Sequence, residues 1–522
     1  EIRLSLVGSE MCIRDSLLGW PSEGTAAASR VLTMELSDPQ TCLRDWSDRS
    51  NSVLEVDPND EHGTTPLVLH GGRLYLRRYW RHEIRIAAAV QSRVRPGQGS
   101  EPEPTATARP WVQALFPVPA AAAGPLASPA GDGAASEPNW QAVACALALR
   151  ARLTVITGGP GTGKTYTAAR LLVLLNALHE GERLRSDGSL PALSMPPLRF
   201  ALAAPTGKAA ARLKQSIDRA LAELVSNLTP ELRRALGVEA LASGLPAAVT
   251  LHRLLGARPD TRRFARHAAS PLEVDLLIVD EASMIHLEMM DALLSALPAS
   301  ARLVLLGDKD QLASVEAGAV MGDLCESGGT SGTPGAASSS AYDAQTVDWL
   351  HRLTGYRLQA SAQPTSALAR QTVMLRHSRR FSGPIGAVAR AVNQGNGPEV
   401  RRLLLESTGG PITMETTPDA RWVALRAVNG GEGQPGSYRD YFEQVSRGPD
   451  ERSGEAFDDW VRSVLKAFDR MRVLCALRDG PWGAAGLNTA IEASLVDSGQ
   501  LSRHRDEWYV GRPVLVTRND PS

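Results

Sequence analysis

A glycine-rich segment constrains this chain more than any other feature. Residues 158–165 read GGPGTGKT and directly follow the apolar run LTVI at 153–156. A strand that ends in such a turn and then opens a helix points backbone N–H groups toward one place, where phosphate oxygens bind. Lys164 would reach the β- and γ-phosphates of a nucleotide, and the Thr165 hydroxyl would bind Mg²⁺. An ordinary glycine-rich turn is the alternative, but the helical run at 167–178 favours a P-loop.

Two further strands end in polar residues. The apolar run 276–279 is followed by Asp280 and Glu281, and the run 302–306 leads into GDKDQL, which contains Gln311. In P-loop enzymes an Asp at this place binds Mg²⁺, and a neighbouring Glu can polarise the attacking water. Because the carboxyl ends of parallel strands meet at one edge of a sheet, we expect these groups to lie beside the P-loop. Solvated strand ends are the alternative.

Composition limits the possible classes of protein. The chain has 522 residues with 43% hydrophobic content, which predicts two to four domains with buried cores. Lys and Arg number 56 against 57 Asp and Glu, so any binding of nucleic acid must be local. The five cysteines include no C-x-x-C pair, which argues against a disulfide framework or zinc site and favours a reducing cytoplasm. We expect no membrane span, because no run of 18 apolar residues is present.

Changes in composition predict the domain organisation. Residues 1–16 resemble translated sequencing-adapter sequence and are left out of the fold prediction. We expect a small N-terminal subunit-interaction module at 17–116, a linker rich in Pro and Ala at 117–138, a first α/β domain at 139–370 and an incomplete second one at 371–522. Further loops are expected at 95–104, 180–197 and 327–340, and further strands at 473–477 and 513–517.

Two basic segments are candidates for binding nucleic acid. The strand run 201–204 leads into PTGK, in which Thr206 and Lys208 stand before an amphipathic helix. The Thr206 hydroxyl and the first helical N–H groups could bind a backbone phosphate. His252 and Arg253 begin a second cluster, in which a single acid stands among five arginines. A solvated surface is the simpler explanation of each cluster taken alone.

Five segments, in their order and spacing, resemble motifs I, Ia, Ic, II and III of superfamily 1 helicases. They are GGPGTGKT, APTGKAAARL, TLHRLLG, VDEASMI and GDKDQLASVEAGAVMGDL. The closest resemblance is to the RecD family, the alpha subunits of exodeoxyribonuclease V, and it runs from about residue 54 to the end of the chain. The segments at 139–141, 375–381 and 478–488 also resemble this family.

The resemblance implies a RecA-like helicase core with ATP and Mg²⁺ as cofactors. Gln141 would recognise the adenine, Gln311 would sense the γ-phosphate, and Arg380 would reach that phosphate across the cleft between the domains. The implied catalytic set is Lys164, Glu281, Gln311 and Arg380, and the implied metal-binding residues are Thr165 and Asp280. The implied contacts to DNA are Thr206, Lys208, His252 and Arg253. The implied nucleotide-binding residues are Gln141, Gly158, Gly159, Pro160, Gly161, Thr162, Gly163, Lys164, Thr165 and Tyr166.

The implied function is that of an ATP-dependent 5′→3′ DNA helicase subunit. In this family it acts on single-stranded DNA in double-strand break repair and recombination, in a RecBCD complex with the beta and gamma subunits (RecB and RecC). The aromatic and basic segment at 71–80 lies in the module that mediates subunit assembly in the family, although by itself it predicts only a hairpin. Two alternatives stay open, a non-enzymatic assembly subunit and another P-loop DNA-dependent ATPase.

The chain departs from the family pattern at a few places. His286 stands where the family often carries an acid, and Tyr166 stands where Thr is common, but neither change removes a catalytic group. The family continues beyond residues 518–520 to motifs V and VI, which add DNA contacts and a second arginine at the γ-phosphate. We therefore expect the 522-residue chain to bind ATP weakly and to hydrolyse it poorly.

Overall fold

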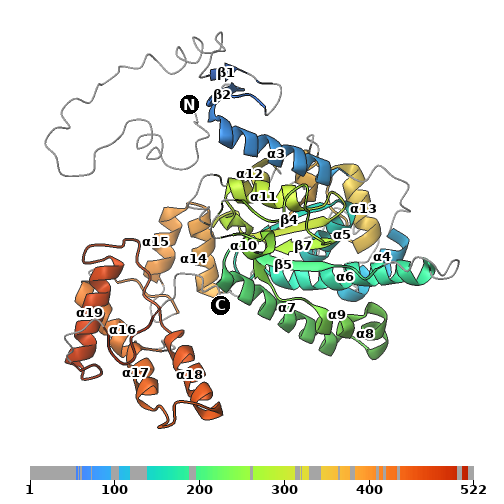
Figure 1. Cartoon of the computed structure of the whole chain (residues 1–522). Coiled ribbons are helices and arrows are strands. Elements are labelled where there is room, and N and C mark those ends of the chain that lie inside the picture. The colour runs from blue at the N-terminus through green and yellow to red at the C-terminus, as the bar shows by residue number, and fades with distance from the viewer. Residues whose placement is uncertain are drawn as a thin grey trace. The chain divides into compact units, whose positions relative to one another are not determined.

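The structure, a computed structural model, forms two compact units, residues 1–382 and 383–522 (Figure 1). The first unit contains a three-stranded sheet and a six-stranded sheet, and each unit is described here by itself. The described residues are 54–56, 58, 62–71, 73–95, 105–117, 138–186, 196–258, 261, 263–311, 318, 320–327, 342–361, 365–376, 383–406, 411–415, 419–431, 436–502 and 508–514.

The six-stranded sheet has the order β6-β5-β7-β8-β4-β9, and every paired strand in it is parallel. Parallel sheets are covered on both faces, so their strands read as continuous apolar runs rather than alternating ones. This explains the apolar runs in the sequence, and all four residues of β7 are buried. The strands are β4 (Leu153–Gly158), β5 (Phe200–Ala204), β6 (Val249–Thr250), β7 (Leu276–Val279), β8 (Arg302–Gly307) and β9 (Thr372–Leu375).

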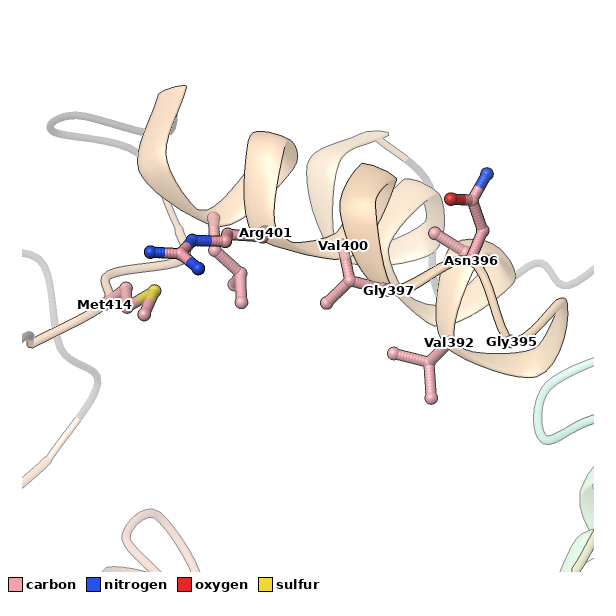
Figure 2. Close-up of a pocket in the computed structure, with 9 residues that line it drawn as sticks. Val392, Gly395, Asn396, Gly397, Val400, Arg401 and Met414 are labelled. Atoms are coloured by element: carbon pink, nitrogen blue, oxygen red, sulfur yellow. The ribbon is translucent and has the colours of Figure 1, made fainter.

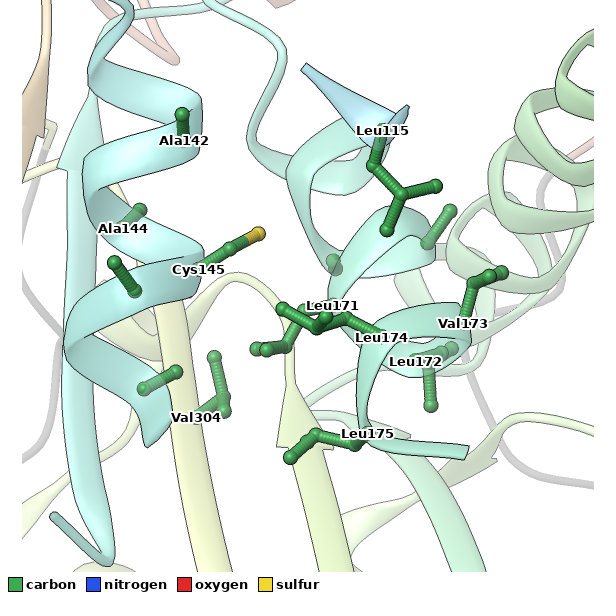
Figure 3. Close-up of a cluster of buried hydrophobic side chains, with 14 of the residues drawn as sticks. Leu115, Ala142, Ala144, Cys145, Leu171, Leu172, Val173, Leu174, Leu175 and Val304 are labelled. Carbon is green, nitrogen blue, oxygen red and sulfur yellow. The ribbon is translucent and has the colours of Figure 1, made fainter. Parts of the chain in front are cut away.

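Helices cover the two faces of this sheet with separate buried cores. Along β4, Ile156 belongs to one core and Val155 to the other, as the alternation of side chains in a strand requires. Figure 3 shows part of the first core, where α5 (Trp140–Arg150) and α6 (Lys164–Ser186) pack together. Residues 141–149 of α5 are all buried. The other helices on this face are α4 (Thr105–Leu115), α7 (Gly207–Asn227), α8 (Pro230–Leu236), α9 (Val238–Gly244) and α13 (Ala344–Thr354).

The opposite face of the sheet is covered by a second set of helices, which includes α11 (Leu287–Ala296), the α-helix that follows β7 and its two acids. The longest of these helices is α3. Its Arg93 side chain donates to the carbonyl of Leu297 at 2.8 Å, which satisfies a backbone acceptor at the C-terminal end of α11. The helices are α3 (Arg77–Val94), α10 (Leu251–Leu255), α11 (Leu287–Ala296) and α12 (Val320–Ser327). Two short 3₁₀ helices, η2 (Ala282–Met284) and η3 (Ala369–Gln371), precede α11 and β9.

The N-terminal segment forms the three-stranded sheet and then α3. In it β1 (Leu54–Val56) pairs in parallel with β2 (Leu67–His70), and β2 pairs antiparallel with β3 (Arg73–Leu76). Gly71 makes the turn between β2 and β3 with φ +55°, which glycine adopts at little cost. The expected hairpin at 71–80 therefore forms only in part, because α3 begins at Arg77 and docks on α11.

Two expected boundaries differ in the structure. Helix α6 extends to Ser186, into the loop expected at 180–197. Helix α4 lies between the loop expected at 95–104 and the linker expected at 117–138. Residues 96–104 and 118–137 of these two segments lie outside the described residues. The first unit extends to Ser382 rather than ending at 370, because β9 pairs in parallel with β4. Most of the expected loop at 327–340 also lies outside the described residues.

The second unit is helical in its described part. Its helices are α14 (Gly383–Asn393), α15 (Gly397–Glu406), α16 (Ala420–Asn429), α17 (Tyr438–Ser446), α18 (Glu455–Phe468) and α19 (Ala484–Asp497). The strand expected at 473–477 is wrong, because no described segment pairs with it and Leu474 is 93% exposed. Residues 513–514 are not in a strand, and 515–517 lie outside the described residues. Within the described part of the chain, no helix has the length and apolar character needed to cross a membrane.

Candidate nucleotide-binding site

Three neighbouring strands bring most of the predicted nucleotide and metal residues to one edge of the sheet. Strand β8 lies between β7 and β4, with Gly307 opposite Thr157 and Leu305 opposite Val279. The glycine turn follows β4, the two acids follow β7, and Gln311 follows β8. In open parallel sheets this edge, beyond the carboxyl ends of the strands, is where ligands bind.

The glycine turn has backbone conformations that only glycine adopts easily. Gly161 has φ +79° and Gly163 has φ +90°. The Thr162 hydroxyl donates to the carbonyl of Gly159 at 2.8 Å, which closes the turn. Gly158 has φ +157°, and a Cβ there would lie 2.6 Å from the carbonyl oxygen of Leu375 at the end of β9. The turn is thus held from both sides before the helix begins at Lys164.

Replacing Gly158 with alanine should destabilise the first unit. The new methyl group would collide with a backbone oxygen of the neighbouring strand, so strand or turn must move, at an expected cost of about 2 to 4 kcal/mol in the free energy of unfolding. Gly159→Ala is the matched control, because no atom lies within 4 Å of a Cβ at that position. Chemical denaturation of the two variants measures the difference. Equal stabilities would show that the strands can separate freely.

The Lys164 side chain lies against the glycine turn that precedes it. Its Nζ donates to the carbonyl of Gly158 at 2.6 Å and to that of Gly159 at 3.2 Å. Phosphate oxygens would replace these carbonyls as acceptors and form stronger, charge-assisted hydrogen bonds. The turn, the lysine and the start of α6 therefore fit a nucleotide phosphate. Thr165 lies in the first turn of the same helix and is half-buried.

The two acids after β7 differ in their surroundings. Burial raises the pKa of Asp280 to about 6, with a further rise from the charge of Glu281 and an opposing effect of Lys164. Asp280 also accepts a hydrogen bond from the backbone N–H of Glu281 at 2.9 Å. A buried carboxylate that the Lys164 charge only partly stabilises fits a divalent cation, which would favour its charged form.

Glu281 has a strained backbone. It has φ 52° and ψ 41°, and it is the one residue other than glycine with positive φ in the described part of the chain. For an L-residue this conformation costs roughly 1 to 2 kcal/mol. Such strain persists where the surrounding structure requires it, and it is concentrated at functional sites. Here it makes the sharp turn from β7 into η2, directly after Asp280.

Gln311 lies in a turn that is tied to the P-loop strand. The backbone N–H of Lys309 donates to the Thr157 hydroxyl on β4 at 3.2 Å. Buried Asp308 accepts from the N–H of Asp310 at 3.1 Å, and its carbonyl accepts from the N–H of Gln311 at 3.3 Å. The Gln311 side chain itself is exposed. This arrangement leaves the amide available to a ligand at the sheet edge.

Gln141 contacts the glycine turn directly. It lies in the first turn of α5, and its Nε2 donates to the carbonyl of Thr162 at 3.4 Å. A Cβ at Gly163 would lie 2.3 Å from this nitrogen, so the side chain packs on the turn. Adenine recognition by Gln141 stays a prediction. Tyr166 lies one turn into α6, and the Arg170 guanidinium stacks 4.1 Å from its ring centroid.

The two candidate DNA segments follow the other strands of the sheet. Thr206 follows β5 and caps α7, since its hydroxyl oxygen accepts from the N–H of Ala209 at 3.3 Å. Lys208 in the first turn of α7 is exposed. His252 and Arg253 are exposed on the short helix α10, directly after β6, which pairs with β5. Sheet pairing thus brings both segments together at the side of the sheet away from β9.

One predicted residue is not described, and one neighbour was missed. Arg380 lies outside the described residues. Arg376, directly after β9, places its guanidinium 5.0 Å from the ring centroid of Trp140. The sequence contained a signal for this contact, because Trp140 adjoins Gln141 and Arg376 begins the segment that carries Arg380. Periodicity could not reveal it, since the two residues meet only through sheet pairing.

The second unit contains a groove that is lined by other residues. It lies between α14 and α15, has a volume of about 340 Å³ and is mainly apolar (Figure 2). Val392, Val400 and Met414 line it together with Arg401 and Asn396. Its lining includes none of the predicted nucleotide, metal or DNA residues.

Known proteins resemble this chain over most of its length. The AAA domain family matches residues 140–317. "RecBCD enzyme subunit RecD" of Mycolicibacterium smegmatis is 36% identical over 91% of this chain and 67% of its own length. The protein of the same name from Haemophilus influenzae is 28% identical over 92% of this chain and 68% of its own length. The chain thus spans about two thirds of the length of these relatives.

Other proteins match over shorter stretches. "ATP-dependent RecD2 DNA helicase" of Deinococcus radiodurans is 34% identical over 37% of this chain and 22% of its own length. Among solved structures, a Pif1 helicase from Bacteroides in complex with ADP-AlF3 and ssDNA is 17% identical. That match covers 51% of this chain and 48% of the other, with a TM-score of 0.23, which is too low to support a conclusion.

Proposed function

The chain belongs to the RecD family of RecBCD enzyme subunits, and from this premise we propose that it is the ATP-dependent DNA helicase subunit of such an enzyme. One observation carries the proposal: β4, β8 and β7 are neighbours, and they bring a P-loop lysine, a polar turn and an acidic pair to one edge of the sheet. This is the arrangement that nucleotide hydrolysis requires.

ATP and Mg²⁺ are the cofactors that these residues fit. The glycine turn and Lys164 would hold the phosphates, and the Thr165 hydroxyl and Asp280 would hold the cation. Bound Mg²⁺ would neutralise charge that develops on the phosphates. Within this site Glu281 would orient and deprotonate the attacking water, and Gln311 would hydrogen-bond the terminal phosphate. Arg380 would add a further positive charge at the terminal phosphate.

Single-stranded DNA is the proposed substrate of the motor. The ends of β5 and β6 would hold its phosphates through the Thr206 hydroxyl, helical N–H groups and the side chains of Lys208, His252 and Arg253. We propose that the motor moves along this strand in the 5′→3′ direction during double-strand break repair and recombination in the cytoplasm, with RecB and RecC as partner subunits. The names of the relatives support these partners.

The proposed function is tested by unwinding. A protein that carries this chain and has the full length of its relatives is assembled with its partner subunits and given fluorescent duplexes that carry either a 5′ or a 3′ single-stranded tail. We expect ATP-dependent strand separation on the 5′-tailed duplex, and its loss when Lys164 is replaced with alanine. If the Lys164→Ala complex assembles and unwinds each duplex to the same extent as the parent complex, the chain is instead an assembly subunit without motor activity.

Thr206→Ala should weaken DNA binding. A hydroxyl can accept from the N–H of Ala209 and still donate to a phosphate, so the loss of a hydrogen bond to a charged group should lower affinity about tenfold. Thr229→Ala is the matched control, because Thr229 caps α8 in the same way, accepting from the N–H of Leu232 at 3.4 Å. Both variants should lose about 1 kcal/mol of stability.

Fluorescence anisotropy of a labelled oligothymidylate, at one fixed salt concentration, compares the two threonine variants. Equal affinities for the two variants would assign Thr206 a capping role alone.

A further inference from the structure

The stack of Arg376 on Trp140 joins two segments that are far apart in the sequence. Trp140 opens α5, and Arg376 directly follows β9. The guanidinium carbon lies 5.0 Å from the centroid of the indole ring. Tryptophan is the aromatic side chain that attracts a cation most strongly, and such contacts contribute roughly 0.5 to 2 kcal/mol.

On the Trp140 side, hydrogen bonds of the neighbouring residues connect the start of α5 to the glycine turn. Asn139 fixes the first turn of α5, because its side-chain oxygen accepts from the N–H of Gln141 at 3.0 Å. The Gln141 amide then donates to the carbonyl of Thr162. The indole Nε1 is buried and has no hydrogen-bond partner among the described residues, so packing and the stack hold the ring in place.

On the Arg376 side, the stack adjoins the same turn. Leu375 lies opposite Gly158 in the register of β9 and β4, and the close approach of its carbonyl leaves no room for a Cβ on Gly158. Arg376 is the next residue, and four residues later comes Arg380.

We propose that Arg376 and Trp140 are a positioning pair, which holds the end of β9 and the start of α5 in a fixed relation to the nucleotide-binding turn. This inference rests on the proposed function. A bound phosphate would replace the carbonyls of Gly158 and Gly159 as acceptors for Lys164. These carbonyls belong to the same glycine turn that Leu375 and Gln141 contact. The pair therefore affects the catalytic rate by positioning this turn, without contacting the nucleotide.

A double-mutant cycle on the assembled complex tests the pair. Arg376→Ala and Trp140→Leu should each lower kcat for DNA-stimulated ATP hydrolysis about tenfold and change the KM for ATP less than about twofold. The double variant should be no slower than either single variant, because each change alone already breaks the stack. Arg376→Lys and Trp140→Phe keep a cation and a ring, and should retain most of the rate.

The matched control is Arg426→Ala, which removes an arginine stacked 5.9 Å from the centroid of Trp422 in the second unit. It should leave kcat unchanged. Single variants within twofold of the parent, effects that multiply in the double variant, or a raised KM with unchanged kcat would each overturn the pair. Unchanged ATP hydrolysis in a Lys164→Ala complex, compared with the parent complex, would instead overturn the proposed function.

Discussion

Replacing Lys164 with alanine is expected to lower DNA-stimulated ATP hydrolysis by about 10² to 10³-fold. The Nζ is the one positive charge that the glycine turn holds against its own carbonyls, at 2.6 Å from Gly158 O and 3.2 Å from Gly159 O, among the described residues. A preorganised donor aimed at charge that develops in the transition state contributes on this scale. Steady-state phosphate release from the assembled complex, with and without single-stranded DNA, measures the loss.

Lys466→Ala is the control for this prediction. Lys466 is exposed in the last turn of α18 in the second unit, and its removal should leave hydrolysis unchanged. The fold should survive the Lys164 change, because the side chain is only half-buried and its hydrogen bonds are to two carbonyls of the glycine turn. A Lys164→Ala complex that hydrolyses ATP within threefold of the parent would refute the assignment of the P-loop as the catalytic site.

Replacing Glu281 with glutamine is expected to separate nucleotide binding from hydrolysis. A positioned general base contributes about 10² to 10⁴-fold to a rate, so kcat should fall by about 10³. The dissociation constant for ATP should change less than about threefold, because Lys164 and the glycine turn remain. Glutamine has the same shape, and the strained backbone at this position is set by the turn from β7 into η2 rather than by the carboxylate.

Two measurements check this prediction: phosphate release gives kcat, and displacement of a fluorescent nucleotide gives the affinity. Glu288→Gln is the matched control, since Glu288 lies nearby in the first turn of α11 but is exposed. It should leave both quantities unchanged. A Glu281→Gln complex with parental kcat would transfer the role of base to another group, of which Asp280 is the nearest in sequence.

The elements that the sequence predicts correctly are those whose signals are local. The apolar runs at 153–156, 276–279 and 302–306 form the central strands, because strands buried on both faces must be apolar throughout. The glycines at 161 and 163 have positive φ, as a phosphate-binding turn requires. Lys164, Asp280 and Gln311 lie at one edge of the sheet, since each is in the segment that follows the carboxyl end of a parallel strand.

The strand expected at 473–477 was wrong because its signal was incomplete. Apolar residues with high β-propensity favour a strand only where another strand supplies hydrogen bonds and a covered face. In the described part of the second unit no strand pairs with this segment, so Val473 packs against the core while Leu474 and Leu477 stay 93% and 62% exposed. Local pattern cannot report whether a pairing partner exists.

The sequence by itself therefore determined which residues of the candidate site bear charge and hydroxyl groups, and which strand ends present them. Only the tertiary structure decided that β9 joins the first sheet beside β4, that Leu375 limits Gly158 to glycine, and that Arg376 meets Trp140. The physical reason is range. Backbone turns and burial patterns are encoded within a few residues, whereas strand order and cross-strand contacts depend on loop closure and packing over the whole domain.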